Sequence, residues 1–292
     1  MARSLKAEFF SVETPGPRPA AFAGVLQTLQ GTPIAHRNQQ VSDYYLRLQT
    51  VASRRTQWHG DVVRIRMDYV PNKASLAGSL TPIALAANEG VGEETAFLYD
   101  EPTQTLVLQR HKPGASPSAF AAYFEAASGI HPIILHPCLQ SSALERLAKL
   151  TKPRKLRIRI APLNQLDAFK GHGLSLETLA NLSNQFKSPT LEVSISMGHS
   201  RGSLEPRAIS STVKALLGIR AKSEEVIRTL QISGRTEDLE ADFIDLLAER
   251  IQETVDLPDG TPRAVPDRVR WEALDKAWDR RWDELRSMAI EP

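Results

Sequence analysis

The chain has 292 residues, of which 41% are hydrophobic and 24% charged, with a formal net charge of +2. This composition is ordinary for a globular protein with one large or two medium cores. No apolar run approaches the ~18 residues of a membrane span, and the opening MARSLKAEFF does not resemble a signal peptide. With a single cysteine, Cys138, the chain cannot form an internal disulfide. We therefore expect a cytoplasmic protein without membrane insertion.

Alternation of apolar and polar residues predicts most elements of the first half. Strands are expected at residues 5–12, 43–51 and 61–70, the last two as an antiparallel pair joined by a loop containing Gly60, and a hairpin at 94–111 that turns at residues 100–104. Helical spacing predicts a helix within residues 20–30, and a second helix starts after Ser116, with Pro117 in its first turn, and ends at Gly129. Residues 81–93 show no period and are expected to be irregular.

The second half also alternates between strands and helices. Strands are expected at 133–140, 155–160, 190–197 and 224–234, and helices at 142–150, 175–186, 206–218 and 269–288. Residues 239–257 fit either a helix or a strand that begins near Phe243. The predicted class is α+β (mixed α/β), with domains at 1–129 and 130–292, each a mainly antiparallel or mixed sheet with flanking helices.

Charge is distributed unevenly along the chain. Residues 131–222 hold 14 Lys and Arg against 5 Asp and Glu, a net +9, whereas residues 223–292 hold 10 against 18, a net −8. Such asymmetry predicts either an anionic partner for the basic segment or a contact between the basic segment and the acidic tail.

The stretch KPRKLRIRIAP (152–162) is the most informative part of the basic segment. A half-buried strand here would direct Leu156 and Ile158 to one face and Lys155, Arg157 and Arg159 to the other. A clustered cationic surface of this kind is typical of nucleic-acid binding, which depends on phosphate neutralisation. The alternative is a solvated edge strand that carries cations to prevent aggregation.

Further cations lie near this strand and in two loops. ASRRTQWHG would place Trp58 and His59 at a hairpin tip beside two arginines, and SMGHSRGSLEPR places His199 and an arginine between Gly198 and Gly202. The candidate DNA-binding residues are Arg54, Arg55, Lys149, Lys152, Arg154, Lys155, Arg157, Arg159 and Arg201.

Catalytic and cofactor signatures are mostly absent from the sequence: it has no Walker A, G-x-G-x-x-G or H-E-x-x-H motif. The pattern HPIILHPC offers His136 and Cys138 but not a complete zinc ligand set, so we predict no catalytic residues, metal site or cofactor. The alternative from another class is a metal-dependent nuclease using Asp242, Asp245 and Glu249. A third hypothesis is that the basic segment docks on an acidic protein.

A tryptophan stripe marks the last predicted helix. Trp271, Trp278 and Trp282 fall on one face together with Leu274 and Leu285. The stripe predicts burial in a core or in a subunit interface, and it is compatible with a homodimer.

The order of elements resembles that of a known group. The segment ETAFLYDEPTQTLVLQRHKPGASPSAFAAYF, followed later by EEVIRTLQISG, FIDLLAERI and a last helix carrying Arg268 and Arg270, resembles the RexA-like phage-exclusion (abortive-infection) proteins and, more distantly, the DNA-binding subunit of the Kiwa defence system. The resemblance is one of layout and transfers no individual residue. It implies a two-domain, dimeric DNA-binding protein of anti-phage defence that needs no enzymatic activity of its own. Together with the basic segment, it predicts a non-enzymatic homodimer that binds double-stranded DNA with little sequence preference, with another defence-system protein as a further partner.

Overall fold

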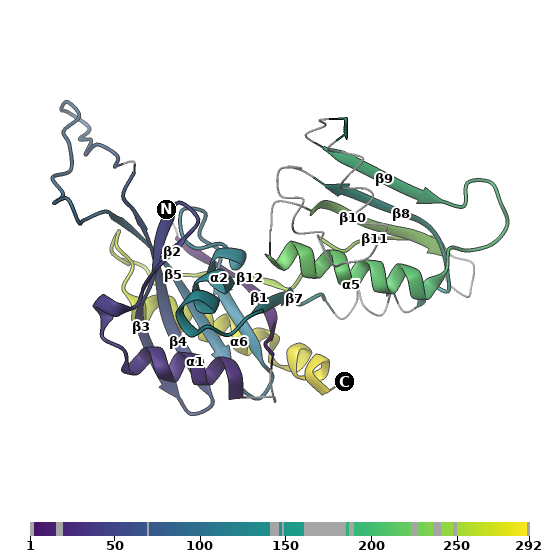
Figure 1. Ribbon diagram of the computed structural model, residues 1–292, viewed down its shortest axis with the longest axis horizontal. Coiled ribbons are helices and arrows are strands. Elements are labelled where there is room, and N and C mark those ends of the chain that lie inside the picture. Colours follow the sequence, from purple (N-terminus) through teal and green to yellow (C-terminus); the bar gives the residue numbers. More distant parts are fainter. Residues whose placement is uncertain are drawn as a thin grey trace. The chain divides into compact units, whose positions relative to one another are not determined.

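The computed structural model describes residues 3–15, 20–68, 70–140, 146–147, 149–160, 185–186, 190–222, 227–235, 241–247 and 250–290 (Figure 1). The chain divides into two compact units. Unit 1 comprises Met1–Ala7, Val12–Ile133 and Glu253–Arg280, and unit 2 comprises Glu8–Ser11, Ile134–Gln252 and Arg281–Pro292. Helices accompany two mainly antiparallel sheets, which confirms the α+β class.

The larger sheet has the strand order β12-β1-β6-β5-β4-β3-β2, and β7 also pairs with β1. Its strands are β1 (Ser4–Glu13), β2 (Asn38–Val41), β3 (Tyr44–Arg54), β4 (Gln57–Arg66), β5 (Val91–Asp100), β6 (Thr105–Gln109), β7 (Ile134–Pro137) and β12 (Gln252–Asp256). The accompanying helices are α1 (Ala20–Gly31), the short η1 (Ile34–His36), α2 (Pro117–Ser128) and α6 (Asp267–Ile290). The predicted strands at 5–12 and 43–51, the antiparallel pairing of the second with the next strand, and the hairpin at 94–111 are confirmed. The strand predicted at 61–70 lies four residues earlier, at Gln57–Arg66.

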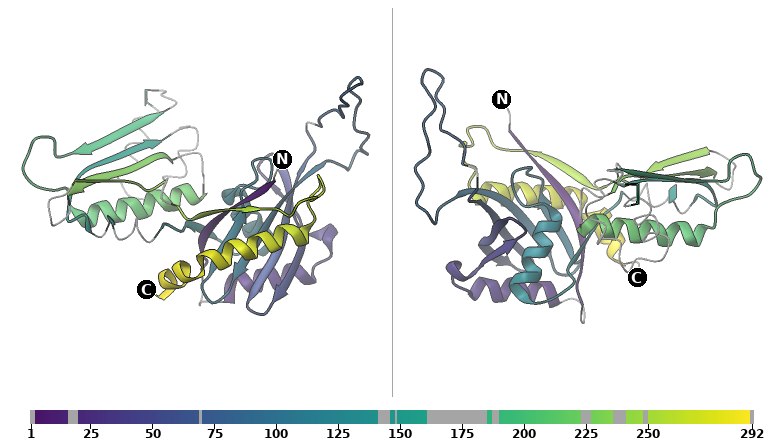
Figure 2. Two further views of the ribbon diagram at one scale, coloured as in Figure 1. Left: turned by 180° about the vertical axis from the view of Figure 1, so that it is seen from behind. Right: turned by 45° about the horizontal axis from the view of Figure 1, so that its top comes forward.

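Helices cover both faces of the sheet in unit 1: α1 and α2 lie on one face and α6 on the other (Figure 2). The α1/α2 face is packed with aromatic rings, among them Phe22, Phe97 and Phe120, with the Phe97 and Phe120 centroids 5.2 Å apart. Gly60 lies within β4, not in a loop as predicted. A Cβ at this position would stand 2.5 Å from the Phe97 ring, so only glycine allows this close packing.

The sequence signals for the ends of α2 are confirmed. The Ser116 hydroxyl accepts a hydrogen bond from the backbone N–H of Ala119 at 3.2 Å, with Pro117 next to it in the first turn. Gly129 ends the helix at φ 72°, and its N–H donates to the Glu125 carbonyl.

Unit 2 contains a four-stranded antiparallel sheet in the order β11-β10-β8-β9. The strands are β8 (Lys152–Ile160), β9 (Leu191–Ser196), β10 (Ile227–Arg235) and β11 (Ala241–Asp245), and the helix is α5 (Pro206–Lys222). Apolar residues of β8, β10 and β11 form one core with Ile209, Val213, Leu216 and Ile219 of α5. The helix therefore covers one face of this sheet.

Several expectations are settled or altered by the structure. Residues 239–257 contribute the strands β11 and β12, and α5 continues past Gly218 to Lys222. Most of the predicted helix 142–150 and nearly all of the predicted helix 175–186 lie outside the described residues.

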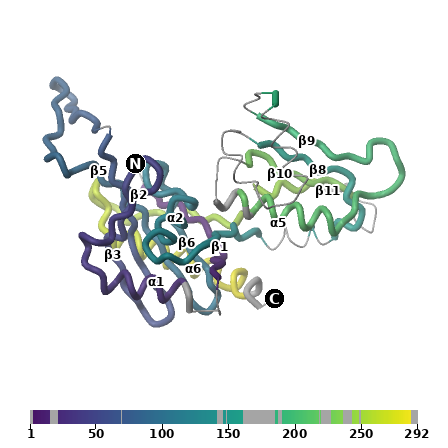
Figure 3. Tube along the Cα trace, in the orientation of Figure 1, coloured from purple at the N-terminus to yellow at the C-terminus, as the bar shows by residue number. Residues whose placement is uncertain are grey.

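The connection between β4 and β5 is a long irregular loop (Figure 3). Leu76 in this loop is exposed. Within the described part of the chain, no helix is both long and apolar enough to span a membrane.

The division into units differs from the predicted domains 1–129 and 130–292, because residues 253–280 group with unit 1. The physical reason is the tryptophan stripe of α6: Trp271, Leu274 and Trp278 are buried, and Trp271 donates a hydrogen bond to Asp61 of β4. Most of the stripe is thus buried, as predicted for a core, whereas Trp282 is half-buried. The homodimer stays a prediction.

Candidate nucleic-acid interface

The β8 strand shows the predicted alternation. Leu156, Ile158 and Ile160 are at most 2% exposed and belong to the core under α5, whereas Lys155, Arg157 and Arg159 are exposed. The strand lies between β10 and β9, so it is central among the described strands and the edge-strand alternative is wrong. We call Lys155, Arg157 and Arg159 the cationic row.

Polar side chains flank the cationic row on the neighbouring strands. Lys155 is paired with Ser233 of β10 and Ser196 of β9, and Arg157 is paired with Gln231 and Ser194. Opposite residues in a sheet lie on the same face, so these hydroxyl and amide groups surround the cations. Such groups also donate hydrogen bonds to phosphate oxygens.

One carboxylate moderates the charge of the row. Arg157 forms an ion pair with Glu192 of β9, with Nη2 and Nε at 2.8 and 2.9 Å from the same carboxylate oxygen. The pair is exposed, so its net stabilisation is small and salt screens it. Lys155 and Arg159 have no ion-pair partner among the described residues, and these two are the principal candidates for phosphate contacts.

Arg154 has a different role from the predicted phosphate contact. Its guanidinium donates hydrogen bonds of 2.9 Å to the carbonyls of Gly198, Ser200 and Gly202. The loop is also tied to β8 by backbone bonds from Met197 N–H to the Arg154 carbonyl and from Leu204 N–H to the Pro153 carbonyl. Arg154 therefore holds the loop of residues 197–204, the anchored loop, against the start of β8.

Arg154→Met is expected to destabilise unit 2 by about 1–3 kcal/mol, because three carbonyls lose a charged donor. Arg154→Lys should recover little of this loss, since an ammonium group cannot reproduce the planar fork. Urea unfolding monitored by circular dichroism measures the effect, with Lys214→Met on the exposed side of α5 as control. A stability of Arg154→Met equal to that of the control would contradict this role.

The remaining predicted residues lie in separate places. Lys152 and Arg201 line one cavity with Arg154, and Lys149 lies just before β8. Arg54 and Arg55 lie at the β3/β4 turn of unit 1, where Arg54 is 4.0 Å from Asp275. Two other cations of the basic segment, Lys170 and Lys187, lie outside the described residues.

The prediction that Trp58 and His59 are available at the hairpin tip is wrong. The turn is tighter than expected, so both residues lie within β4 and are 7% and 1% exposed. His59 Nε2 lies 2.6 Å from Asp275 of α6, and Trp58 donates to Glu101. Their rings therefore cannot stack on a base.

The acidic nuclease alternative gains no geometric support. Asp245 accepts hydrogen bonds from Gln231 and the Leu247 N–H, and Glu249 is outside the described residues. No group of three or more His, Cys, Asp or Glu residues suited to a metal occurs in the part of the chain that the structure describes.

Cys138 is buried, and burial raises the pKa of its thiol to about 12. We expect native Cys138 to resist alkylation by iodoacetamide at pH 8, because the thiolate is the reactive species. A Ser211→Cys substitution on the exposed side of α5 provides an accessible control thiol. Mass spectrometry should find one label in that variant and a second one only after unfolding in urea. Rapid labelling of the native wild-type chain would contradict this prediction.

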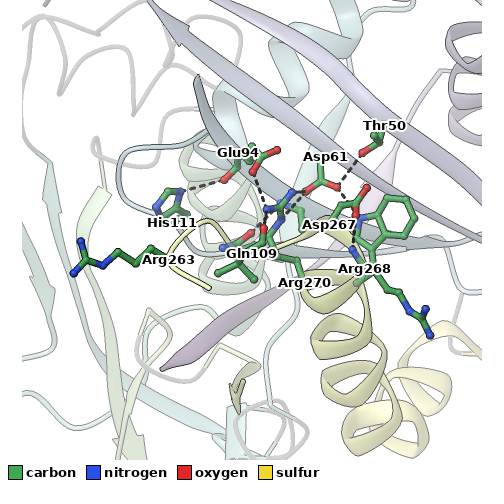
Figure 4. A network of polar contacts seen from close by, with 12 residues as sticks. Thr50, Asp61, Glu94, Gln109, His111, Arg263, Asp267, Arg268 and Arg270 are labelled. Carbon is green, nitrogen blue, oxygen red and sulfur yellow. Dashed lines mark hydrogen bonds and ion pairs between the residues drawn. The ribbon is translucent and has the colours of Figure 1, made fainter. Parts of the chain in front are cut away.

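A buried ion-pair network in unit 1 was not foreseen (Figure 4). The Arg270 side chain is 5% exposed, and its Nη2 and Nε lie 2.7 and 2.9 Å from Asp61 Oδ1. The other Asp61 oxygen accepts from Trp271 at 2.7 Å and from Thr50 at 3.0 Å, and Glu94 binds Arg270 Nη1 at 2.8 Å. The network joins α6 to β3, β4 and β5.

Two opposing effects act on the Asp61 carboxyl. Burial raises its pKa, while the charge of Arg270 and the hydrogen bonds from Arg270, Thr50 and Trp271 act in the opposite direction. Burying either charged side chain alone would be costly, so Asp61 and Arg270 are stable in the core only as a pair. A detectable sequence signal was present: Arg270 lies four residues from Leu274, beside the apolar stripe, where an unpaired charge would be costly.

A cavity of about 400 Å³ adjoins this network in unit 1. Its polar lining mixes cations with carboxylates: Arg3, Arg263 and Arg270 face Glu93 and Glu94. His111 and Arg263 lie on one side of the network (Figure 4). This mixed charge makes the cavity less suited to a polyanion than the surface of unit 2.

Residues 22–262 match the model of a family of unknown function, DUF6731, so the chain belongs to that family. No curated protein matches the sequence. The resemblance to RexA-like and Kiwa proteins stays a prediction.

Proposed function

We propose that the protein binds double-stranded DNA, largely independently of sequence, through the cationic row of unit 2. The observation that carries the proposal is the position of the row: three exposed cations at alternate positions of a central strand, on the face opposite α5. Successive members are about 7 Å apart along the strand, so they present a line of charge to a phosphate backbone.

The surroundings of the row also support this proposal. A central strand is protected from edge-to-edge pairing by its neighbours, so its cations are not needed for that purpose. Glu192 stands opposite Arg159 in the β8/β9 register and pairs with Arg157, and it is the single carboxylate paired with the row among the described residues. The cross-strand neighbours of Lys155 and Arg157 are Ser and Gln. Phosphate contacts carry no base readout, so little sequence preference follows.

The test is fluorescence anisotropy with two labelled duplexes of about 30 base pairs and unrelated sequence. We expect equal affinities for both at low salt, because the contacts are to the backbone. No binding to either duplex, or strong preference for one of them, would contradict the proposal. A role in anti-phage defence rests on the resemblance alone and needs a separate plaque assay with phage-challenged cells.

One additional assay distinguishes DNA binding without cleavage from the nuclease alternative. The protein is incubated with duplex DNA and Mg²⁺ or Mn²⁺, and the DNA is examined on a denaturing gel. Intact DNA is expected from a binding protein, whereas metal-dependent cleavage that is lost in Asp242→Asn/Asp245→Asn would establish the enzyme. Binding to acidic proteins but not to DNA would favour the docking hypothesis.

A further inference from the structure

A cavity of about 250 Å³ lies in unit 2 where the start of β8, the end of β10 and the anchored loop meet. The described residues that line it are Lys152, Arg154, Arg201, Gly202, Ser203 and Arg235. Four of these six are cations, and none of the six is a carboxylate. A concave site lined by charge of one sign concentrates ions of the opposite sign.

The shape of this cavity is built into the backbone. The β8/β10 register shifts between Ser233 and Gly234, which leaves Arg154 of β8 without an opposite residue on β10. A Cβ on Gly234 would lie 2.5 Å from the Lys152 carbonyl oxygen, so β10 and β8 approach closely there. On the opposite side, Arg154 holds three carbonyls of the anchored loop. Both walls are therefore fixed without a ligand, which lowers the entropic cost of binding.

The charges in the cavity are not compensated within the described part of the chain. Lys152 and Arg235 stand directly opposite each other in the β8/β10 register, an arrangement of like charges that destabilises a strand pair. Neither they nor Arg201 has an ion-pair partner among the described residues. A bound anion would relieve this repulsion.

Size limits the class of ligand. Drug-sized molecules and cofactors occupy cavities of roughly 300–1,000 Å³, so a cavity of about 250 Å³ suits a small group. Arginine forks and a lysine match the oxygens of a phosphate, and several donors favour a dianionic phosphate over a singly charged diester.

We propose that this cavity binds a phosphate monoester. The ligand is either the terminal phosphate of a nucleic-acid chain or the phosphate of a free nucleotide, and the first source rests on the proposed DNA binding. In that case unit 2 recognises a DNA end in the cavity while the cationic row contacts the diester backbone.

The experiment compares one duplex with 5′-phosphate or 5′-hydroxyl ends, and separately titrates AMP by isothermal calorimetry. The phosphorylated duplex should bind about ten-fold tighter, because the added dianion gains charged hydrogen bonds. Arg201→Ala/Arg235→Ala should remove this difference, whereas Lys214→Ala should keep it. Binding of AMP that is lost in the double variant, without an end preference, would identify the free nucleotide as the source.

Failure of this inference is distinguishable from failure of DNA binding. If both duplexes bind equally and AMP does not bind, the cavity assignment is wrong, and salt-sensitive binding of both duplexes would still support the cationic row. Conversely, Lys155→Glu/Arg159→Glu should lower the affinity for both duplexes and preserve their ratio. If that variant bound the 5′-phosphate and 5′-hydroxyl duplexes with equal affinity, the row and the cavity would not have separate roles.

Discussion

Replacing Arg270 by methionine is expected to destabilise the protein by about 3–5 kcal/mol, the usual cost of leaving one buried charge without its partner. The substitution keeps much of the side-chain volume but leaves Asp61 at 0% exposure without its cation. It also removes the bond to Glu94 that ties α6 to β5. Urea unfolding monitored by tryptophan fluorescence measures the change in the free energy of unfolding, and Trp271 reports on the network because it belongs to it.

Arg268 is the matched control for this substitution. It lies two positions earlier in α6, is 81% exposed and pairs with Glu272 one turn along the helix. Exposed pairs contribute little to stability, so Arg268→Met should unfold close to wild type. If both variants lowered the free energy of unfolding by the same amount, the Asp61–Arg270 pair would not be what anchors α6.

Charge reversal in the cationic row is expected to have a large effect on the affinity for duplex DNA. Lys155→Glu/Arg159→Glu should weaken binding to duplex DNA by about 100-fold at 0.1 M salt, since two phosphate contacts are lost and repulsion replaces them. The fold should be retained, because both side chains are exposed and the apolar face of β8 is unchanged. Circular dichroism and anisotropy measured on the same preparation separate the two properties.

The control for this variant must carry the same net charge. Lys214→Glu/Lys276→Glu changes two exposed lysines, one on α5 and one on α6, and alters the net charge equally. Its affinity should stay within a few-fold of wild type, because the loss depends on position as well as on total charge. Comparable weakening in both variants would mean that the row has no special role.

Local signals were sufficient to predict much of the fold. The strand KLRIRI, the Ser116–Gly129 limits of α2 and the hairpin turn at residues 100–104 each depend on neighbours in sequence, and the structure has them as expected. The position of β8 in its sheet depends on pairing with residues about 40 and 75 positions away, which periodicity does not encode.

The parts of the site that were missed depend on the same long-range contacts. Trp58 and His59 appeared to be loop residues because the two-residue turn at Arg55 and Thr56 has no glycine, and Arg55 itself takes φ 58°. The role of Arg154 follows from a loop more than 40 residues later. From the sequence alone, an arginine at the start of a strand is expected to be exposed, and nothing indicates that Arg154 binds three carbonyls.

The most direct test of the central claim is the salt dependence of duplex binding by the wild-type protein, measured from 50 to 300 mM NaCl. We predict that log K falls linearly with log salt, with a slope of about −2 to −3 for the roughly three phosphate contacts of the cationic row. In Lys155→Glu/Arg159→Glu the slope should be shallower by about 2. A slope near zero, or one that the charge reversal leaves unchanged, would contradict phosphate binding by the cationic row.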